Sequence, residues 1–184
     1  MSTLKRVGGF TLVELLMVVA VAGLLSAVSV PAISGAMQRY QLNTASRTIM
    51  AEIRAARFTA IAKNRTMRVL FNCPGPNQFR VVEVVGTAAI DDDANRCSET
   101  DYPFPNPDPN VAPNADGPVF WLNYGVTFAG VQDLQISTRG RVQPLTNCPA
   151  CAVAAPPANI GVSNGHAGQA ITVSASGMVG QSQY

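Results

Sequence analysis

The sequence contains a single histidine and no recognisable set of catalytic residues. His166 lies between glycines, in Asn164-Gly165-His166-Ala167-Gly168, and no motif links it to a nucleophile or a metal. A glycine-rich phosphate-binding pattern is also missing. We therefore expect no enzymatic activity, no cofactor and no resident metal. The chain is expected to be a substrate of enzymes, not an enzyme.

Charged residues are scarce, at 13% of the chain, and the net charge is only +2. Lys5 and Arg6 supply both of these charges, and beyond residue 9 the basic and acidic residues are equal in number. A global charge argument for nucleic-acid binding is therefore excluded.

Apolar residues are abundant, at 47%, and they concentrate between Phe10 and Val30, after a short basic leader that ends in Gly8-Gly9. As a helix, this run spans roughly 30 Å, which matches the hydrocarbon core of a bilayer. Lys5 and Arg6 favour a cytoplasmic N-terminus. The residues after Pro31 are then expected outside the cytoplasm.

Glu14 is an anomaly within this apolar run. A carboxylate inside a membrane helix costs roughly 2.5 to 3.5 kcal/mol. Cleavage after Gly9 would create an α-amino group on Phe10, and the amino group of a neighbouring subunit could offset the charge of Glu14. A plain membrane anchor explains neither Glu14 nor Gly9-Phe10. A cleaved secretory signal has a shorter core without a carboxylate.

The string Gly9-Phe10-Thr11-Leu12-Val13-Glu14-Leu15 closely resembles the type III signal sequence of type IV pilins and type II secretion pseudopilins. The resemblance implies that a membrane prepilin peptidase cuts after Gly9 and methylates the nitrogen of Phe10. It also implies that Glu14 guides assembly and that Pro31 loosens the helix inside a filament.

One long helix is predicted over residues 10–64, with 10–30 in the membrane or filament core and 31–64 amphipathic. Pro31 is expected to bend the helix and not to end it. Apolar residues at helical spacing form a stripe that should dock on the sheet of the head. The stripe consists of Ala45, Ile49, Ile53, Ala56 and Ala60.

Arginines form a second arc on this helix, and two more flank a glycine in the head. They are Arg39, Arg47, Arg54, Arg57 and Arg65, with Arg139 and Arg141. Such a stripe could contact DNA through phosphates. We favour a surface that is solvated or pairs with acidic residues of neighbouring subunits, and we expect Arg139-Gly140-Arg141 to be a turn.

Residues 65–184 are predicted to form a β-rich head outside the cytoplasm, so the fold class is α+β with an antiparallel sheet. Pro74-Gly75-Pro76 is expected to be a turn, and the six prolines of 98–118 indicate a long surface loop. The predicted strands are 66–72, 78–85, 119–122, 126–128, 131–137, 158–163, 170–174 and 178–181.

All four cysteines follow the apolar run, where disulfides are the default outside the cytoplasm. We expect the pairs Cys73–Cys97 and Cys148–Cys151. A redox role for the C-x-x-C motif lacks a following helix, and a zinc site lacks a second C-x-x-C. Asp91-Asp92-Asp93 could hold Ca²⁺, although we favour solvated carboxylates.

Two further segments, Ala51 to Arg57 with Ala60, and Ile171 to Gly177, are similar to the GspH/FimT group of minor pilins and minor pseudopilins. Some members bind DNA through a C-terminal Gly-Arg-x-Arg motif, but this chain has Gly177-Met178-Val179-Gly180 in its place. We therefore favour a minor pilin of a type IV pilus, held in the bacterial inner membrane before assembly with other subunits. A minor pseudopilin of type II secretion and a DNA-binding pilin of a transformation pilus are the alternatives.

Overall fold

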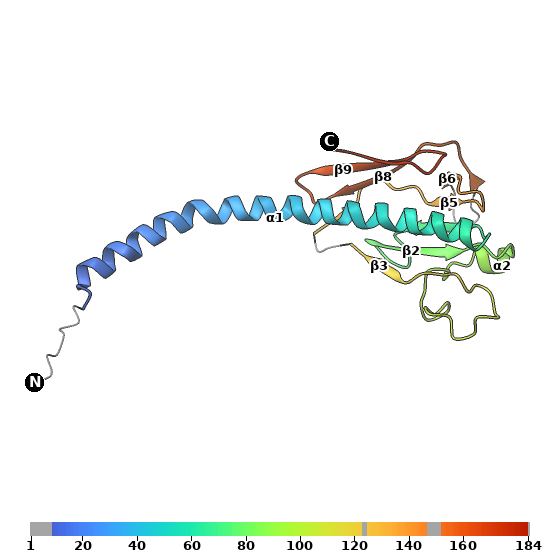
Figure 1. Ribbon diagram of the computed structural model, residues 1–184, viewed down its shortest axis with the longest axis horizontal. Helices are drawn as coiled ribbons and strands as arrows, with labels where there is room; N and C mark the ends of the chain where they lie inside the picture. Colours follow the sequence, from blue (N-terminus) through green and yellow to red (C-terminus); the bar gives the residue numbers. More distant parts are fainter. Residues whose placement is uncertain (1–8, 123–124, 147–151, 184) are drawn as a thin grey trace, which may run out of the picture. The chain divides into compact units, whose positions relative to one another are not determined.

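The computed structural model describes residues 9–122, 125–146 and 152–183, and the side chains of 28–32 lie outside the described part (Figure 1). The chain divides into two compact units, residues 1–39 and 40–184. A single helix, α1 (Leu12–Ala62), passes from the first unit into the second. In the first unit, the described backbone consists of the residues before α1 and the beginning of this helix.

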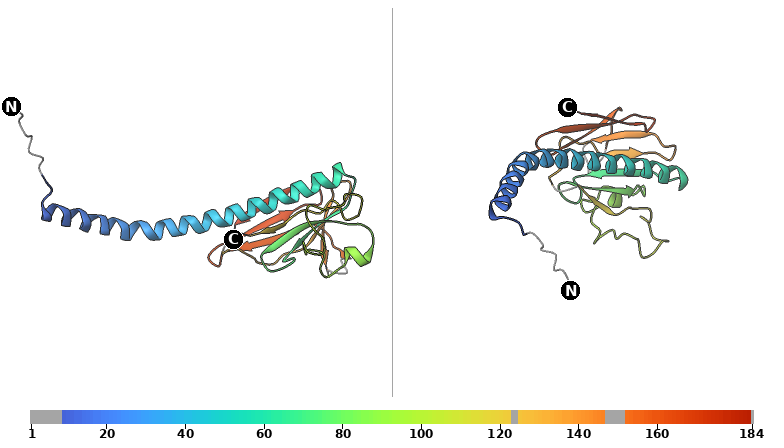
Figure 2. Two further views of the ribbon diagram at one scale, coloured as in Figure 1. Left: turned by 90° about the horizontal axis from the view of Figure 1, so that it is seen from below. Right: turned by 60° about the vertical axis from the view of Figure 1, so that its left-hand side comes forward.

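In the second unit, α1 buries one face. Leu42 and the five stripe residues Ala45, Ile49, Ile53, Ala56 and Ala60 are at most 3% exposed. The predicted docking stripe is therefore confirmed. Figure 2 shows this part of α1 lying across the strands of the head.

A six-stranded antiparallel sheet has the order β3-β2-β1-β5-β6-β7. Its central strands β1 and β2 pair from Met67↔Glu83 to Phe71↔Phe79. Both are buried along their whole length, because α1 covers one face and the β2–β3 connection covers part of the other. The strands are β1 (Met67–Phe71), β2 (Gln78–Glu83), β3 (Val119–Trp121), β5 (Leu134–Ile136), β6 (Val142–Thr146) and β7 (Ala152–Val153).

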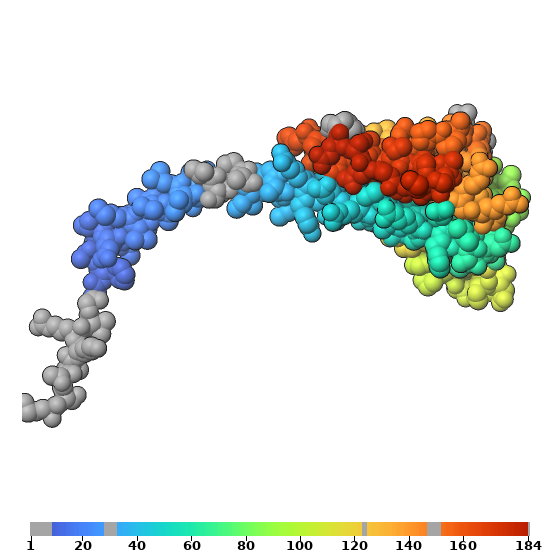
Figure 3. All heavy atoms as spheres, turned by 45° about the horizontal axis from the view of Figure 1, so that its top comes forward, coloured from blue at the N-terminus to red at the C-terminus, as the bar shows by residue number. Residues whose placement is uncertain are grey.

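A second, four-stranded antiparallel sheet has the order β10-β9-β8-β4. Its strands are β4 (Thr127–Phe128), β8 (Ala158–Ser163), β9 (Gly168–Val173) and β10 (Val179–Gln183). Figure 3 shows β9 and β10, in red, lying against the C-terminal half of α1. The predicted α+β class with an antiparallel β-rich head is confirmed, and the described part of the head contains these two sheets.

The core lies between α1 and the inner faces of the two sheets. Phe71, Phe79, Phe120 and Phe128 form an aromatic cluster with ring centroids 5.1 to 6.4 Å apart. One polar contact is also buried there: Ser46 on α1 donates to the side-chain oxygen of Gln169 on β9. This contact fixes the position of the helix along β9, because sliding would leave both groups unpaired.

The proline-rich segment 98–118 contains no helix or strand, as predicted. Buried arginines attach it to the sheet. The guanidinium of Arg80, which is fully buried, donates to the carbonyl oxygens of Ser98, Tyr102 and Gly117. The loop therefore has a defined path over the outer face of β2.

Three elements were not predicted: α2 (Ala88–Asp91), β6 and β7. Pro144 lies within β6 and has no N–H to donate. Its carbonyl oxygen still accepts from the amide of Ala154 on the β7 side. The eight predicted strands exist, and their ends differ from the predicted ends by at most three residues.

Candidate functional site

The N-terminal candidate site begins in non-helical backbone. Gly9 and Phe10 precede α1, and Phe10 is 82% exposed. Apart from its two chain neighbours, no described residue comes within 4 Å of a Cβ placed on Gly9.

Thr11 caps the helix. Its hydroxyl oxygen accepts from the amide of Glu14 at 3.2 Å, and its carbonyl accepts from the amide of Leu15 at 3.1 Å. Thr11 and Glu14 have the spacing of a capping box. This capping role was not predicted, although Thr-x-x-Glu before an apolar run is the sequence signal of a capping box.

Glu14 lies in the first turn of α1 and is exposed. A carboxylate is favoured there by the partial positive charge of the helix N-terminus. Among the described residues, no cation lies within ion-pair distance of Glu14. Its carboxylate is thus available to a partner from another molecule.

The apolar side chains around Glu14 are exposed as well. Phe10, Leu12, Val13, Leu15 and Leu16 are each 59% exposed or more. Within the described part of the chain, no helix has the combination of length and apolarity that crossing a membrane requires. The backbone of α1 continues through Pro31, whose side chain is outside the described part.

The predicted arginine stripe divides into two groups. Arg39, Arg47 and Arg54 are exposed. Arg57 donates through Nε to the carbonyl oxygen of Gly140 at 3.0 Å, and Arg65 pairs with the buried carboxylate of Glu83. Two of the five arginines are thus engaged within the chain itself.

The turn between β5 and β6 brings two more arginines to Arg57. Gly140 has φ +74°, which suits glycine, and its amide donates to the carbonyl of Ser137. Arg139 and Arg141 flank it and are both exposed. The structure therefore confirms the predicted turn and groups Arg57 with Arg139 and Arg141.

Cys73 and Cys97 form a disulfide with a Cα–Cα distance of 5.5 Å, as predicted. It attaches the start of the β2–β3 connection to the end of β1, in a small apolar cluster with Leu70 and Val82. The predicted pair Cys148–Cys151 lies outside the described residues. No free cysteine is present in the described part of the chain.

The three aspartates considered for Ca²⁺ face different partners. Asp91 accepts from the amides of Val85 and Gly86, and Asp92 pairs with Arg68 at 3.2 Å. Asp93 accepts from the Asn95 amide and from the Tyr102 hydroxyl, and these bonds lower its pKa. The described residues contain no group of three potential metal ligands.

His166 is exposed at the β8–β9 turn, where its backbone amide donates to the side-chain oxygen of Asn164. This is the geometry of an Asx turn. This hydrogen bond accounts for the conformation of the turn. It uses the backbone of His166 and does not involve a nucleophile.

The comparisons with known proteins bear on the N-terminal segment. Residues 4–30 match the family model described as the prokaryotic N-terminal methylation motif. No curated protein matches the chain. Among solved structures, the type IV minor pilin FimU of Pseudomonas aeruginosa is 14% identical, with a TM-score of 0.49, over 79% of this chain and 90% of that chain.

The motif covers the candidate cleavage bond, the cap at Thr11 and Glu14, which the structure places at the start of α1. The prediction of a type IV pilin-like N-terminus is therefore confirmed: residues 4–30 of this chain carry the prokaryotic N-terminal methylation motif.

Proposed function

We propose that the chain is a minor pilin, a structural subunit of a type IV pilus. The leader 1–9 is removed by a prepilin peptidase, the new amino group of Phe10 is methylated, and α1 enters the filament core. Residues 65–184 form the head. Before assembly, the subunit is held in the bacterial inner membrane by residues 10–30, with its N-terminus in the cytoplasm and its head in the periplasm.

One observation carries this proposal: the bond Gly9–Phe10 is followed by a capped helix with exposed apolar side chains and a first-turn carboxylate that has no ion-pair partner among the described residues. Leaving that carboxylate unpaired in an apolar layer would be costly. The methylated amino group of an adjacent subunit's Phe10 would neutralise this carboxylate as the helices pack. The pair would therefore favour one axial position of each helix relative to its neighbour.

The test is the incorporation of Glu14→Gln and Glu14→Leu subunits into filaments. Gln has nearly the shape of Glu but carries no charge, so both variants should enter filaments poorly while the leader is still removed. Glu52→Gln, at a partly exposed acid of the same helix, is the matched control. Normal incorporation of both Glu14 variants would refute the proposed role of this carboxylate.

A minor pseudopilin would use the same helix, so the assay must score the filament system itself. Deletion of the gene should abolish or reduce piliation and leave type II secretion intact. Loss of secretion with normal piliation would instead identify the chain as a pseudopilin.

A further inference from the structure

The C-terminal end of α1 lies directly on two glycine turns, one from each sheet. Besides its bond to Gly140, Arg57 covers Gly177: a Cβ on Gly177 would come within 2.8 Å of Arg57 Cδ and Nε. The amide of Val142, next to the first turn, donates to the carbonyl of Ala175 in the second at 3.0 Å. The helix end and both turns therefore form one continuous surface.

This surface combines exposed apolar side chains with unpaired arginines, and we call it the turn surface. Its members are Phe58, Ile61 and Met178, which are 73%, 50% and 73% exposed, together with the exposed Arg54, Arg139 and Arg141. Within the described residues, none of these arginines is within ion-pair distance of a carboxylate. Protein interfaces are enriched in aromatic residues, Met and Arg, so this composition is typical of a docking surface.

The proline-rich loop 98–118 has the complementary composition. Four of the eleven acidic residues lie in this loop, and Asp116 among them is paired with Arg96. Glu99, Asp101 and Asp108 of the loop are exposed, and they lie near the exposed apolar residues Phe104 and Val111 in the sequence. The loop thus offers carboxylates for the arginines and apolar side chains for Phe58, Ile61 and Met178.

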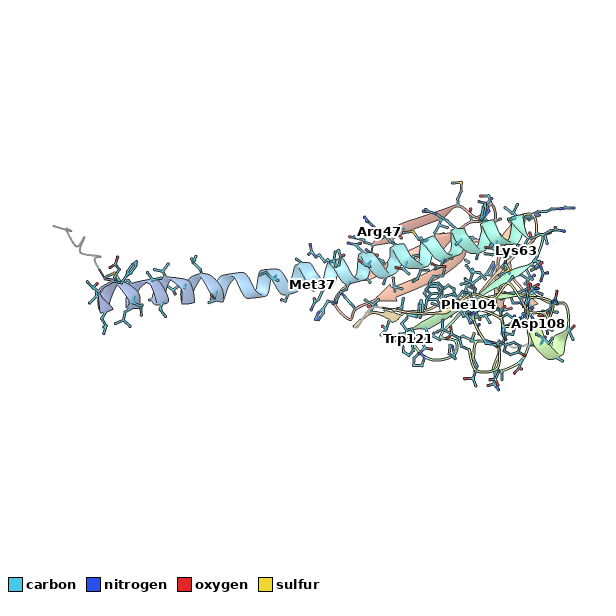
Figure 4. All side chains as sticks on the ribbon, turned by 60° about the horizontal axis from the view of Figure 1, so that its bottom comes forward. Met37, Arg47, Lys63, Phe104, Asp108 and Trp121 are labelled. Atoms are coloured by element: carbon cyan, nitrogen blue, oxygen red, sulfur yellow. A yellow bond between two sulfur atoms is a disulfide. The ribbon has the colours of Figure 1, made fainter. Side chains whose placement is uncertain are left out.

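The two surfaces lie on different sides of the head. The loop connects β2 to β3 at one end of the six-stranded order, whereas the turn surface lies where β5–β6 and β9–β10 meet α1. Figure 1 shows the loop on one side of α1 and the four-stranded sheet on the other. In Figure 4, Phe104 and Asp108 lie on the side of α1 away from Arg47. The loop of one copy can therefore meet the turn surface of another.

We infer that the turn surface of one copy docks the proline-rich loop of a second copy. Because the two patches differ, the contact is heterologous and leaves a free patch at each end, so it extends an assembly instead of closing a pair. This inference rests on the proposed function as a filament subunit. A symmetric pair through the turn surface would place arginines against arginines, which is unfavourable.

A photo-crosslinking amino acid in place of Arg139 tests the contact in the full-length chain, in the membranes and filaments of producing cells. The expected product is an adduct of two copies whose cross-link maps to residues 99–111 of the second. The double variant Arg54→Glu/Arg141→Glu should lower its yield roughly tenfold, since both charges become repulsive. The double variant Asp101→Lys/Asp108→Lys should do the same, and combining all four changes should restore it.

Lys63→Glu is the matched control. Lys63 is exposed directly after α1, and its amide still donates to the carbonyl of Thr59, so continuing the helix places it about 120° from Arg57. An adduct with another protein or with nucleic acid, an adduct between two turn surfaces, or a yield that charge reversal leaves unchanged would overturn the inference. Leader removal is scored on the same samples. An unprocessed leader would refute the proposed function, whereas the cross-link alone decides the docking contact.

Discussion

Arg96 and Asp116 form an ion pair that is almost completely buried, with side-chain exposures of 2% and 5%. Asp116 also accepts from the backbone amide of Glu83, and Arg96 donates to the carbonyl of Glu83 and stacks over Tyr102 at 4.6 Å. The two residues hold both ends of the proline-rich loop on β2. The loop is therefore presented in one conformation, as a docking element requires.

Arg96→Met should destabilise the head by about 3 to 5 kcal/mol, because it leaves the carboxylate of Asp116 buried without its partner. Arg96→Met/Asp116→Asn should recover more than half of this loss, since Asn is uncharged and can still accept from Glu83. Denaturant unfolding of the full-length chain in detergent, followed by near-UV circular dichroism, measures both effects. Equal stability of Arg96→Met and the exposed control Arg139→Met would contradict this assignment.

Gly161 on β8 allows the backbones of β4 and β8 to approach closely. A Cβ at Gly161 would overlap the carbonyl oxygen of Ala129, and the two strands exchange hydrogen bonds at this point. Gly161→Ala should therefore cost about 3 kcal/mol or more, because a backbone atom cannot move aside cheaply. Gly180→Ala on β10, where a Cβ meets nothing within 4 Å, should change stability little. Similar melting temperatures for the two variants would show that the approach is not tight.

Asp133 gives the head a pH dependence of predictable sign. Burial raises its pKa above the ordinary 3.8, although Phe71 donates its amide to the carboxylate and Arg68 opposes the shift. The folded chain then holds this proton to a higher pH than the unfolded chain. The stability that protonated Asp133 contributes is lost as pH rises from its unfolded pKa through the folded one.

Asp133→Asn keeps the acceptor for Phe71 and removes the titration. The unfolding free energy of Asp133→Asn relative to the native chain should therefore increase as pH rises from about 3 and level off near neutrality. Asp101→Asn, at an exposed carboxylate, should not show this trend. A relative stability that falls with rising pH would contradict the raised pKa.

The sequence predicted the elements whose patterns are local. The stripe from Ala45 to Ala60 has helical spacing. Cys73 lies between the two predicted strands and Cys97 directly precedes the predicted loop, so the helix face and the disulfide could both be inferred. The division into two sheets depends on which strands pair across long sequence distances. Periodicity carries no information about that choice.

The hydrogen-bond and ion-pair partners of the arginines could not be predicted from local spacing either. Helical spacing placed Arg57 on α1 with the other basic residues, whereas Arg65 follows the end of this helix, which stops at Ala62 and not at Asn64. Their partners, Gly140 and Glu83, come from other elements and depend on tertiary packing. The turn surface could not be predicted from the sequence, because it combines residues as far apart in the chain as Phe58 and Met178.

The proposed processing and assembly depend most on the residue at which the mature chain begins. Mass spectrometry of the N-terminal peptide, from subunits recovered from filaments, should find Phe10 as the first residue with one added methyl group on its nitrogen. A chain that still begins at Met1, or that begins at any residue other than Phe10, would contradict the account.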